Sequence, residues 1–307
     1  MVAIELRKKI NDANRSNTKT KFDSKLVLPR IMVLFFSLLL INNSYAIVYV
    51  DKDRSGGNGT SWADAYNSIE DAIAGSGENQ EFWVAEGTYT PSSHASWGTQ
   101  LIPKQASQFY GGFAGNETSR DQRDVSAHPT IIDGGPNNLI HVILIKLETK
   151  DVTIDGFTIK NGSATGDGSV YWDKFGGGIF ADIVEESGHN TTILNCTFEN
   201  NTATEQGGAV FINRRNATFE NCVFQSNNSK TGGALGATDT DLVYDAILTL
   251  SDCTFNSNQA NLGAATSQRG GAIWTLKLST VIQRSTFTGN SAGQLGGAVE
   301  FNQPRSA

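Results

Sequence analysis

The stretch "FENNTATEQGGAVF", Phe198 to Phe211, decides the fold, because it holds two signals that return later in the chain. The first signal is F-x-x-N, and the second is G-G-A followed by an apolar residue. Four segments with the first signal superpose without gaps, at residues 191–201, 217–227, 248–258 and 280–290. The second signal follows each of them, at residues 207–210, 232–235, 270–273 and 296–299. A fainter fifth copy, "VTIDGFTIKNG", precedes them at residues 152–162, and the chain is therefore a repeat protein.

The repeat is rich in β-branched residues, Asn and Gly, which favour short strands joined by corners over helices. Within one copy the apolar positions are Ile193, Cys196 and Phe198, and this spacing places a corner at Leu194 and Asn195. One period then supplies roughly two or three strands of three to five residues, too few to bury a core alone. Copies stacked in parallel, about 4.8 Å apart, can share a core. We therefore predict an all-β fold, a single-stranded right-handed parallel β-helix.

Equal positions of successive copies form columns in such a helix. We expect the phenylalanines to stack inside, and the asparagines to line a corner through amide hydrogen bonds and a left-handed backbone. Gly-Gly supplies the other tight corner. The columns are Phe198, Phe224, Phe255 and Phe287; Asn201, Asn227, Asn258 and Asn290; and Cys196, Cys222 and Cys253.

The cysteine column favours a ladder of buried thiols, because side chains in one parallel ladder point the same way and suit the disulfide dihedral poorly. A bridge between two of the three cysteines remains the alternative. It would leave one thiol free.

The segment before the repeats predicts a cap. Residues 61–75, "SWADAYNSIEDAIAG", form an apolar stripe with acidic residues opposite, which predicts an amphipathic α-helix ending at Gly75. Terminal rungs of a solenoid expose apolar surface, so we expect this helix to cover the N-terminal end. "EFWVAEGTYT", residues 81–90, is the expected first rung. Because the last stretch, "GGAVEFNQPRSA", carries no cap, we expect further rungs beyond Ala307.

Residues 1–46 predict a secretory signal peptide. A basic stretch precedes "IMVLFFSLLLI", Ile31 to Ile41, which is short for a membrane span, and "SYA" ends at Ala46. We expect cleavage after Ala46, with an uncleaved membrane anchor as the rival. The domains are then 1–46, the signal peptide; 47–130, the N-terminal cap and first rungs; and 131–307, the repeats.

The mature chain is acidic, which excludes nucleic acid as a partner. The whole chain has 24 basic and 31 acidic residues, and residues 1–46 hold eight and three of them. The remaining part therefore has 16 basic and 28 acidic residues, a net charge of −12. Affinity for nucleic acid rests mainly on Lys and Arg that neutralise phosphates.

The motif pair resembles a known family. "FENN" with "GGAV", and "FTGN" with "GGAV", resemble the repeats of chlamydial polymorphic outer membrane proteins and of the wider right-handed parallel β-helix family of bacterial surfaces. Residues 49–91 and 109–135 are similar to the usual leading segment of that family. The resemblance covers residues 47–307 and implies a pectin lyase-like fold, export to the cell surface or outer membrane, and a role as an adhesin or passenger domain.

Two acidic groups are candidate metal sites. Asp51 and Asp53, in "DKDRSG", resemble the first half of a calcium loop, although the twelfth position is Trp62 where a bidentate Glu is needed. A polar turn before the helix is the alternative. The second group is Asp239, Asp241 and Asp245, in extra sequence between the second and third full copies, where loops commonly carry binding residues. Solvated loop acids are the alternative there. We expect that the protein requires no cofactor. If these acidic residues bind a metal ion, the expected ion is Ca²⁺, at Asp51, Asp53, Asp239 and Asp241.

A second long excursion, "SATGDGSVYWDKFGG", presents aromatic and charged residues together, namely Tyr171, Trp172 and Lys174. Aromatic rings beside polar groups suit stacking on sugars or on another protein. Alternatively, Trp172 covers the edge of a rung.

Two classes of function are open. The first is a monomeric, non-catalytic recognition scaffold at the cell surface. Its partner would be a glycan or a protein, and it would contact a membrane only through export or anchoring. The second is a polysaccharide lyase or another carbohydrate-active enzyme, which needs clustered carboxylates and a base. The outward column before the cysteines offers Asn195, Asn221, Asp252 and Arg284, one acid and one base rather than a cluster. Because Arg214 and Arg215, adjacent at a corner, are expected to be solvated, we favour the scaffold and assign no catalytic residue.

Overall fold

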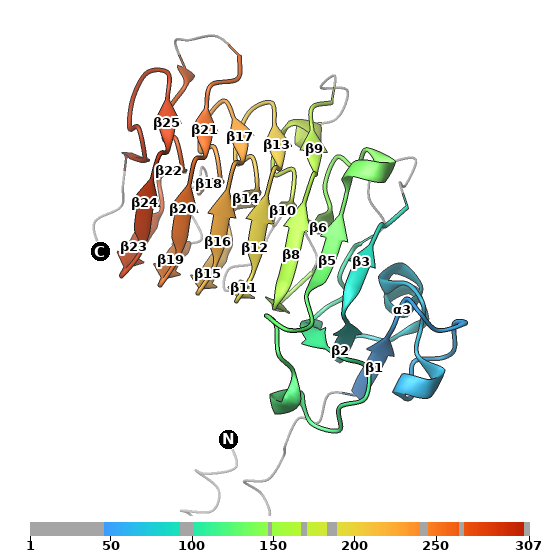
Figure 1. Ribbon diagram of the computed structural model, residues 1–307. Coiled ribbons are helices and arrows are strands. Elements are labelled where there is room, and N and C mark those ends of the chain that lie inside the picture. The colour runs from blue at the N-terminus through green and yellow to red at the C-terminus, as the bar shows by residue number, and fades with distance from the viewer. Residues whose placement is uncertain are drawn as a thin grey trace, which may run out of the picture. The chain divides into compact units, whose positions relative to one another are not determined.

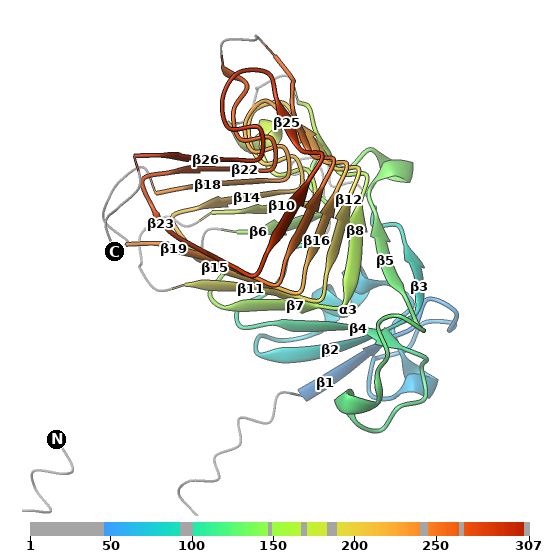
Figure 2. The same cartoon turned by 60° about the vertical axis from the view of Figure 1, so that its left-hand side comes forward.

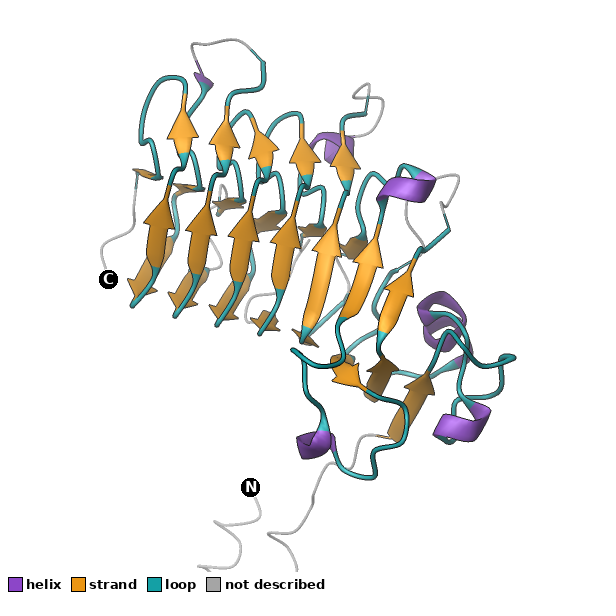
Figure 3. Cartoon of the chain, in the orientation of Figure 1, coloured by secondary structure: helices purple, strands orange, loops and turns teal. Residues whose placement is uncertain are grey.

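The chain folds as a right-handed parallel β-helix (Figures 1 and 2). The computed structural model describes residues 46–92, 101–146, 149–166, 171–182, 189–239, 245–263 and 267–303. Tyr45–Ala307 form one compact unit. Within the described residues, four parallel sheets run along the solenoid, and the predicted fold class is confirmed. Figure 3 shows how few helical turns accompany the strands.

Each sheet stacks one strand from each successive rung, a rung being one coil of the helix. The first sheet, sheet A, contains β1 Ala46–Val50, β2 Gln80–Ala85, β4 Gln108–Phe113, β7 Val152–Asp155, β11 Asn190–Leu194, β15 Asn216–Glu220, β19 Ile247–Ser251 and β23 Ser279–Gln283. Sheet B contains β3 Gly87–Tyr89, β5 Thr130–Asp133, β8 Phe157–Lys160, β12 Thr197–Glu199, β16 Val223–Gln225, β20 Thr254–Asn256 and β24 Thr286–Thr288.

The other two sheets complete the rungs. Sheet C contains β6 Ile143–Ile145, β10 Ile179–Ala181, β14 Val210–Asn213, β18 Leu235–Thr238, β22 Ile273–Leu276 and β26 Val299–Asn302. Sheet D contains β9 Ser163–Ala164, β13 Thr202–Ala203, β17 Asn228–Ser229, β21 Gln259–Ala260 and β25 Ser291–Ala292. A full rung thus has four strands rather than two or three. The additional strand, in sheet D, has two residues and is too short to produce an alternating pattern.

The strand register makes residues one period apart vertical neighbours. Phe198 pairs with Phe224, Phe224 with Phe255 and Phe255 with Phe287. The ring centroids are 4.9, 4.6 and 4.8 Å apart in this order, with planes within 8° of parallel. The first three rings are fully buried. Burial of each contributes about 2 kcal/mol to folding.

Tight corners join the strands of each rung. Strand β11 ends at Leu194 and β12 begins at Thr197, so the predicted corner at Leu194 and Asn195 is confirmed. Asn195 has φ of 50° there, in the left-handed region. At the glycine corner, Gly207 has φ of 64°, and a Cβ atom would lie 2.1 Å from the Val210 carbonyl oxygen. This corner therefore requires glycine.

The asparagine column forms a continuous ladder of amide hydrogen bonds. Nδ2 of Asn201 donates to Oδ1 of Asn227 at 3.1 Å, and the bonds from Asn227 to Asn258 and from Asn258 to Asn290 are both 2.9 Å. The prediction of left-handed backbone at these asparagines is wrong. The positive φ belongs to the residues just before them, Asn200, Ser226 and Ser257, each at 55°. Those residues turn the corner, which lets the following Asn point inward between rungs.

The cysteine column is buried, and all three thiols are free. Burial raises the pKa of Cys196 to about 12. A hydrogen bond with the Cys253 thiol, together with burial, raises the pKa of Cys222. The same hydrogen bond lowers the pKa of Cys253. The thiols of Cys196 and Cys222 therefore stay protonated near neutral pH, and the three buried side chains pack as small apolar groups.

An α-helix caps the N-terminal end, but it is shorter than predicted. Helix α3 spans Ile69–Gly75 and follows a 3₁₀ turn, η1, at Trp62–Asp64. Tyr66 breaks the predicted helix because it pairs with β1, where its N–H donates to the Tyr49 carbonyl at 3.0 Å. The helix begins only after Ser68, whose Oγ accepts from the Asp71 N–H at 3.1 Å. The predicted apolar stripe is buried throughout: Trp62, Ala65, Ile69, Ala72 and Ile73.

The first strand lies earlier than expected. β1 precedes residues 81–90 and pairs with β2, so that Ala46 lies opposite Gln80. The remainder of the predicted signal peptide, residues 1–45, lies outside the described residues. Strand β5 runs through the boundary placed between residues 130 and 131. Within the described ranges, every helix is too short or too polar to cross a membrane.

Candidate ligand groove

The acidic excursion after β18 does not present Asp239 on the surface. Asp239 is fully buried, and its Oδ2 accepts from the Ala246 N–H at 3.3 Å. Asp245 is exposed with φ of 48°, and Asp241 lies outside the described residues. The side chain of Asp239 is therefore not exposed to solvent, and calcium or ligand binding by Asp239, Asp241 and Asp245 stays a prediction.

The aromatic excursion covers one face of the solenoid. Residues Tyr171–Lys174 form a 3₁₀ turn, η4, and Trp172 packs on a cluster of Leu144, Phe175, Phe180 and Phe211 outside sheet C. Lys174 is half-buried, and the side chain of Tyr171 lies outside the described part. Trp172 thus covers part of the outer face of sheet C, and ligand binding by Tyr171, Trp172 and Lys174 stays a prediction.

Asp51 and Asp53 face different partners. The carboxylate of Asp51 accepts from the Asp53 N–H at 3.0 Å and from Nε of Arg54 at 2.9 Å. Asp53 points into solvent and pairs with Lys52 at 2.7 Å. Among the described residues, no three His, Cys, Asp or Glu side chains gather as metal ligands. The geometry here is that of a polar turn.

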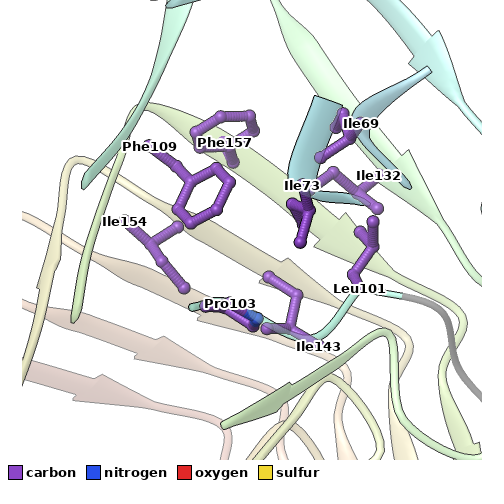
Figure 4. Close-up of a pocket in the computed structure, with 9 residues that line it drawn as sticks. All are labelled: Ile69, Ile73, Leu101, Pro103, Phe109, Ile132, Ile143, Ile154 and Phe157. Atoms are coloured by element: carbon purple, nitrogen blue, oxygen red, sulfur yellow. The ribbon is translucent and has the colours of Figure 1, made fainter. Parts of the chain in front are cut away.

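A cavity beneath the cap helix is too small and too apolar to hold a ligand. It measures about 20 Å³, and Figure 4 shows Ile69 and Ile73 of α3 facing it together with Leu101, Ile132 and Ile143. A water molecule needs polar partners to occupy such a space, and this lining has none. The cavity is a packing defect at the junction of cap and core.

A groove of about 570 Å³ lies outside sheet B, and none of the predicted ligand-binding residues line it. Residues 114–129, here called the wall segment, leave β4 and carry a 3₁₀ turn, η2, at Arg120–Gln122, seen as the green turn low in Figure 1. The floor comes from the starts of β8, β12 and β16 on three successive rungs. The lining residues are Arg123, Val125, Ser126, Pro129, Thr130, Gly156, Phe157, Thr158, Asn195, Cys196, Thr197, Asn221 and Val223.

The wall segment is held rigidly by both charged and aromatic contacts. Arg123 donates to the Gly111 and Asp155 carbonyl oxygens at 3.1 and 3.3 Å, and its guanidinium forms an ion pair with the Asp155 carboxylate. The guanidinium of Arg120 lies 4.5 Å from the centre of the Tyr110 ring. Trp62 Nε1 donates to the Glu117 carbonyl at 2.9 Å.

The Glu117 carboxylate organises the start of the wall segment. It accepts from the backbone N–H groups of Ala114, Gly115 and Asn116 at 2.6, 3.1 and 3.0 Å. Burial raises the pKa of Glu117, but these hydrogen bonds outweigh it and leave the pKa lowered. The wall is therefore pre-formed around an ionised carboxylate.

Gly156 lets the wall approach the floor closely. A Cβ atom at this residue would lie 2.8 Å from Val125 Cγ2 and 2.9 Å from Arg123 Nη1. In later rungs the equivalent left-handed position holds Asn195, Asn221, Asp252 or Arg284. This glycine is a sequence signal that the repeat alignment alone could have supplied.

The floor presents uncharged polar groups. Asn195 Nδ2 donates to Asp155 Oδ1, and Asn221 Nδ2 donates to Asn195 Oδ1, both at 2.8 Å. Thr158 and Thr197 lie side by side in the register with half-buried side chains. Their hydroxyls make no hydrogen bond within the described part of the chain and can serve a ligand. Asp155 borders this floor through its hydrogen bond with Asn195, and Arg123 pairs with its carboxylate.

The other basic residues considered for catalysis are also engaged. Arg284 forms two hydrogen bonds with Asp252, at 2.7 and 2.6 Å, which lower the pKa of Asp252. The expectation that Arg215 is solvated is wrong, because it is 1% exposed and donates to the carbonyl oxygens of Thr149 and Lys150 at 2.7 and 2.8 Å. Arg214 pairs with Asp182 at 3.1 Å. Each of these guanidiniums has a structural role.

Comparison with known proteins identifies the repeat. Residues 195–213 and 252–276 match the family model of the Chlamydia polymorphic membrane protein repeat. The chain resembles the polymorphic membrane proteins in its repeats. No curated protein matches the chain in sequence.

Solved structures give a weaker likeness. Two crystal structures of the pectin methylesterase from Aspergillus niger, one deglycosylated and one retaining an N-acetylglucosamine stub at an asparagine, align with a TM-score of 0.40 and 14% sequence identity. Each alignment covers 85% of this chain and 90% of that chain. No activity follows from a similarity at this level.

Proposed function

We propose that the chain is the recognition scaffold of an exported surface protein, which binds a partner and performs no chemistry on it. The observation that carries the proposal is the groove outside sheet B, which combines a rigid wall with a floor of hydroxyl and amide groups. Asp155, which borders that floor, is paired with Arg123. A site built this way offers hydrogen bonds and shape but no free acid or base.

The repeat supports location at the cell surface. The matching family model describes a membrane protein repeat, and residues 1–46 have the features of a secretory signal peptide. An adhesin or passenger domain projects loops and grooves from a stiff solenoid, and the stacked rings and amide ladder supply that stiffness.

Two measurements test the proposal. Intact producing cells are labelled with an antibody against residues 47–303, and labelling without permeabilisation is expected. The purified chain is then incubated with pectate, alginate and methylated pectin in the presence of Ca²⁺, while unsaturated product and released methanol are followed. A surface scaffold gives neither product, whereas turnover that disappears in Arg123→Ala would replace the proposal with a carbohydrate-active enzyme.

A further inference from the structure

We propose that the groove outside sheet B binds a neutral glycan that lies along the axis of the solenoid. This inference rests on the proposed recognition function and names the ligand class of the groove. Its first support is charge. Arg123, the only charged residue in the lining, is 15% exposed and already paired with Asp155.

The surroundings disfavour an acidic polymer. The chain beyond residue 46 carries a net charge of −12, so a polyuronate or a sulfated glycan meets repulsion that a neutral polymer avoids. Binding an anion would also require Arg123 to release Asp155 and leave that carboxylate, 6% exposed, without its cation. Such uncompensated buried charge is costly.

The floor offers the same kind of group on successive rungs. Hydroxyls of Thr158 and Thr197 lie about 4.8 Å apart along the axis, and the carboxamide of Asn221 follows on the third rung. Asn221 is an exposed lining residue, and within the described residues its Oδ1 accepts no hydrogen bond. On the third rung Val223 takes the column position of Thr197, and Asn221 lies at the corner before it, so each of the three rungs contributes a polar group without forming one column. A sugar chain, whose units repeat hydroxyl donors and acceptors, can match such groups.

A peptide fits the same floor less well. Extended peptides commonly bind by adding a strand to a free sheet edge, where backbone groups supply the affinity. Here β12 pairs with β8 and β16, and these pair in turn with β5 and β20, so the backbone N–H and C=O groups of the floor strands are used within sheet B. The apolar part of the lining, Val125, Pro129 and Val223, is a shallow surface on which the C–H faces of sugar rings can pack.

The wall segment reduces the cost of binding. Arg123, Glu117 and the close approach at Gly156 hold it in place before any ligand arrives. Because the groove needs little ordering on binding, a modest number of hydrogen bonds can yield measurable affinity.

Isothermal titration of the full chain tests the inference. The probes are hexasaccharides of β-1,4-linked glucose, mannose and xylose, with hexagalacturonate as the anionic counterpart and an uncharged hexapeptide pool as the peptide counterpart. Thr197→Arg places a long side chain in the floor, and Thr286→Arg is the matched control, since Thr286 occupies the same column two rungs beyond the groove. Ser126→Arg fills the groove from the wall and serves if Thr197→Arg unfolds.

The expected result is saturable binding of at least one neutral hexasaccharide, weakened about tenfold or more by a groove variant, which corresponds to about 1.4 kcal/mol, and unchanged by Thr286→Arg. The inference is overturned if no neutral hexasaccharide binds, if hexagalacturonate or the peptides bind more tightly, or if Thr197→Arg and Thr286→Arg behave alike. The labelling of intact cells does not depend on this titration. If no neutral glycan binds, the glycan proposal fails, while the proposed surface location is still decided by the labelling.

Discussion

Removal of one amide from the middle of the asparagine ladder is the most informative perturbation of the fold. The side chain of Asn227 makes four hydrogen bonds: it donates to the Phe198 carbonyl and to Asn258 Oδ1, and it accepts from the N–H and the side-chain amide of Asn201. All four are buried, with lengths between 2.9 and 3.1 Å. Each buried hydrogen bond contributes about 1 kcal/mol, so Asn227→Ala is expected to lower the free energy of unfolding by about 4 kcal/mol.

The measurement is urea unfolding followed by circular dichroism, with hydrogen exchange read rung by rung because a solenoid need not unfold in one step. Asn290→Ala, at the half-buried end of the ladder, is expected to cost less than half as much. Gln225→Ala, exposed on the same rung as Asn227, is the surface control and is expected to change stability by less than about 0.5 kcal/mol. A loss below about 1 kcal/mol for Asn227→Ala would refute the reasoning that a shared amide ladder holds the rungs together.

Three further predictions concern the wall segment and the thiols. Gly156→Asn should push the wall segment outward and speed tryptic cleavage after Arg120 and Arg123. Asn195→Gly, in the same column, should leave the cleavage rate unchanged. Equal cleavage rates for the two variants would contradict the close packing at Gly156. The pKa of Glu117 is lowered in the folded chain. The ionised carboxylate therefore stabilises the fold fully above its pKa in the unfolded chain, about 4.3, and this stabilisation is lost as the pH falls through its pKa in the folded chain. The NMR chemical shifts of the Gly115 and Asn116 amides should therefore change with pH at a midpoint below about 4.3. In Glu117→Gln this pH-dependent change should be absent. A thiol reagent should find three reactive cysteines after denaturation and none before; fewer than three denatured thiols would indicate a bridge.

The columns were predictable from the sequence because each reflects one strong local rule. Apolar residues at the position of Phe198 must face inward, and glycine is required at the position of Gly207, where no side chain fits. A rung too small to bury its own core must stack on copies of itself. These rules act within one period, and gapless alignment of the repeats exposes them.

Other features depend on contacts between distant segments. The start of α3 was misplaced because Tyr66 pairs with β1, an interaction that helical periodicity does not register. Arg215 was expected in solvent, but carbonyl oxygens of Thr149 and Lys150, far earlier in the chain, enclose its guanidinium.

The groove itself was missed for the same reason. Its wall and its floor come from segments that the sequence separates, and no pattern within residues 114–129 says which rungs they will lie against. Gly156, where the later copies carry Asn195, Asn221, Asp252 and Arg284, is the position whose sequence reflects the close packing on that corner.

The floor of the groove exists only if residues one period apart are vertical neighbours, and a distance in solution tests this most directly. One outward column of sheet B consists of Lys160, Glu199, Gln225, Asn256 and Thr288. Spin labels at Lys160 and Thr288, four rung steps apart, are expected to give a narrow distance distribution near about 19 Å by pulsed electron resonance, at about 4.8 Å per step. A broad distribution, or one centred beyond about 30 Å, would contradict the stacked solenoid.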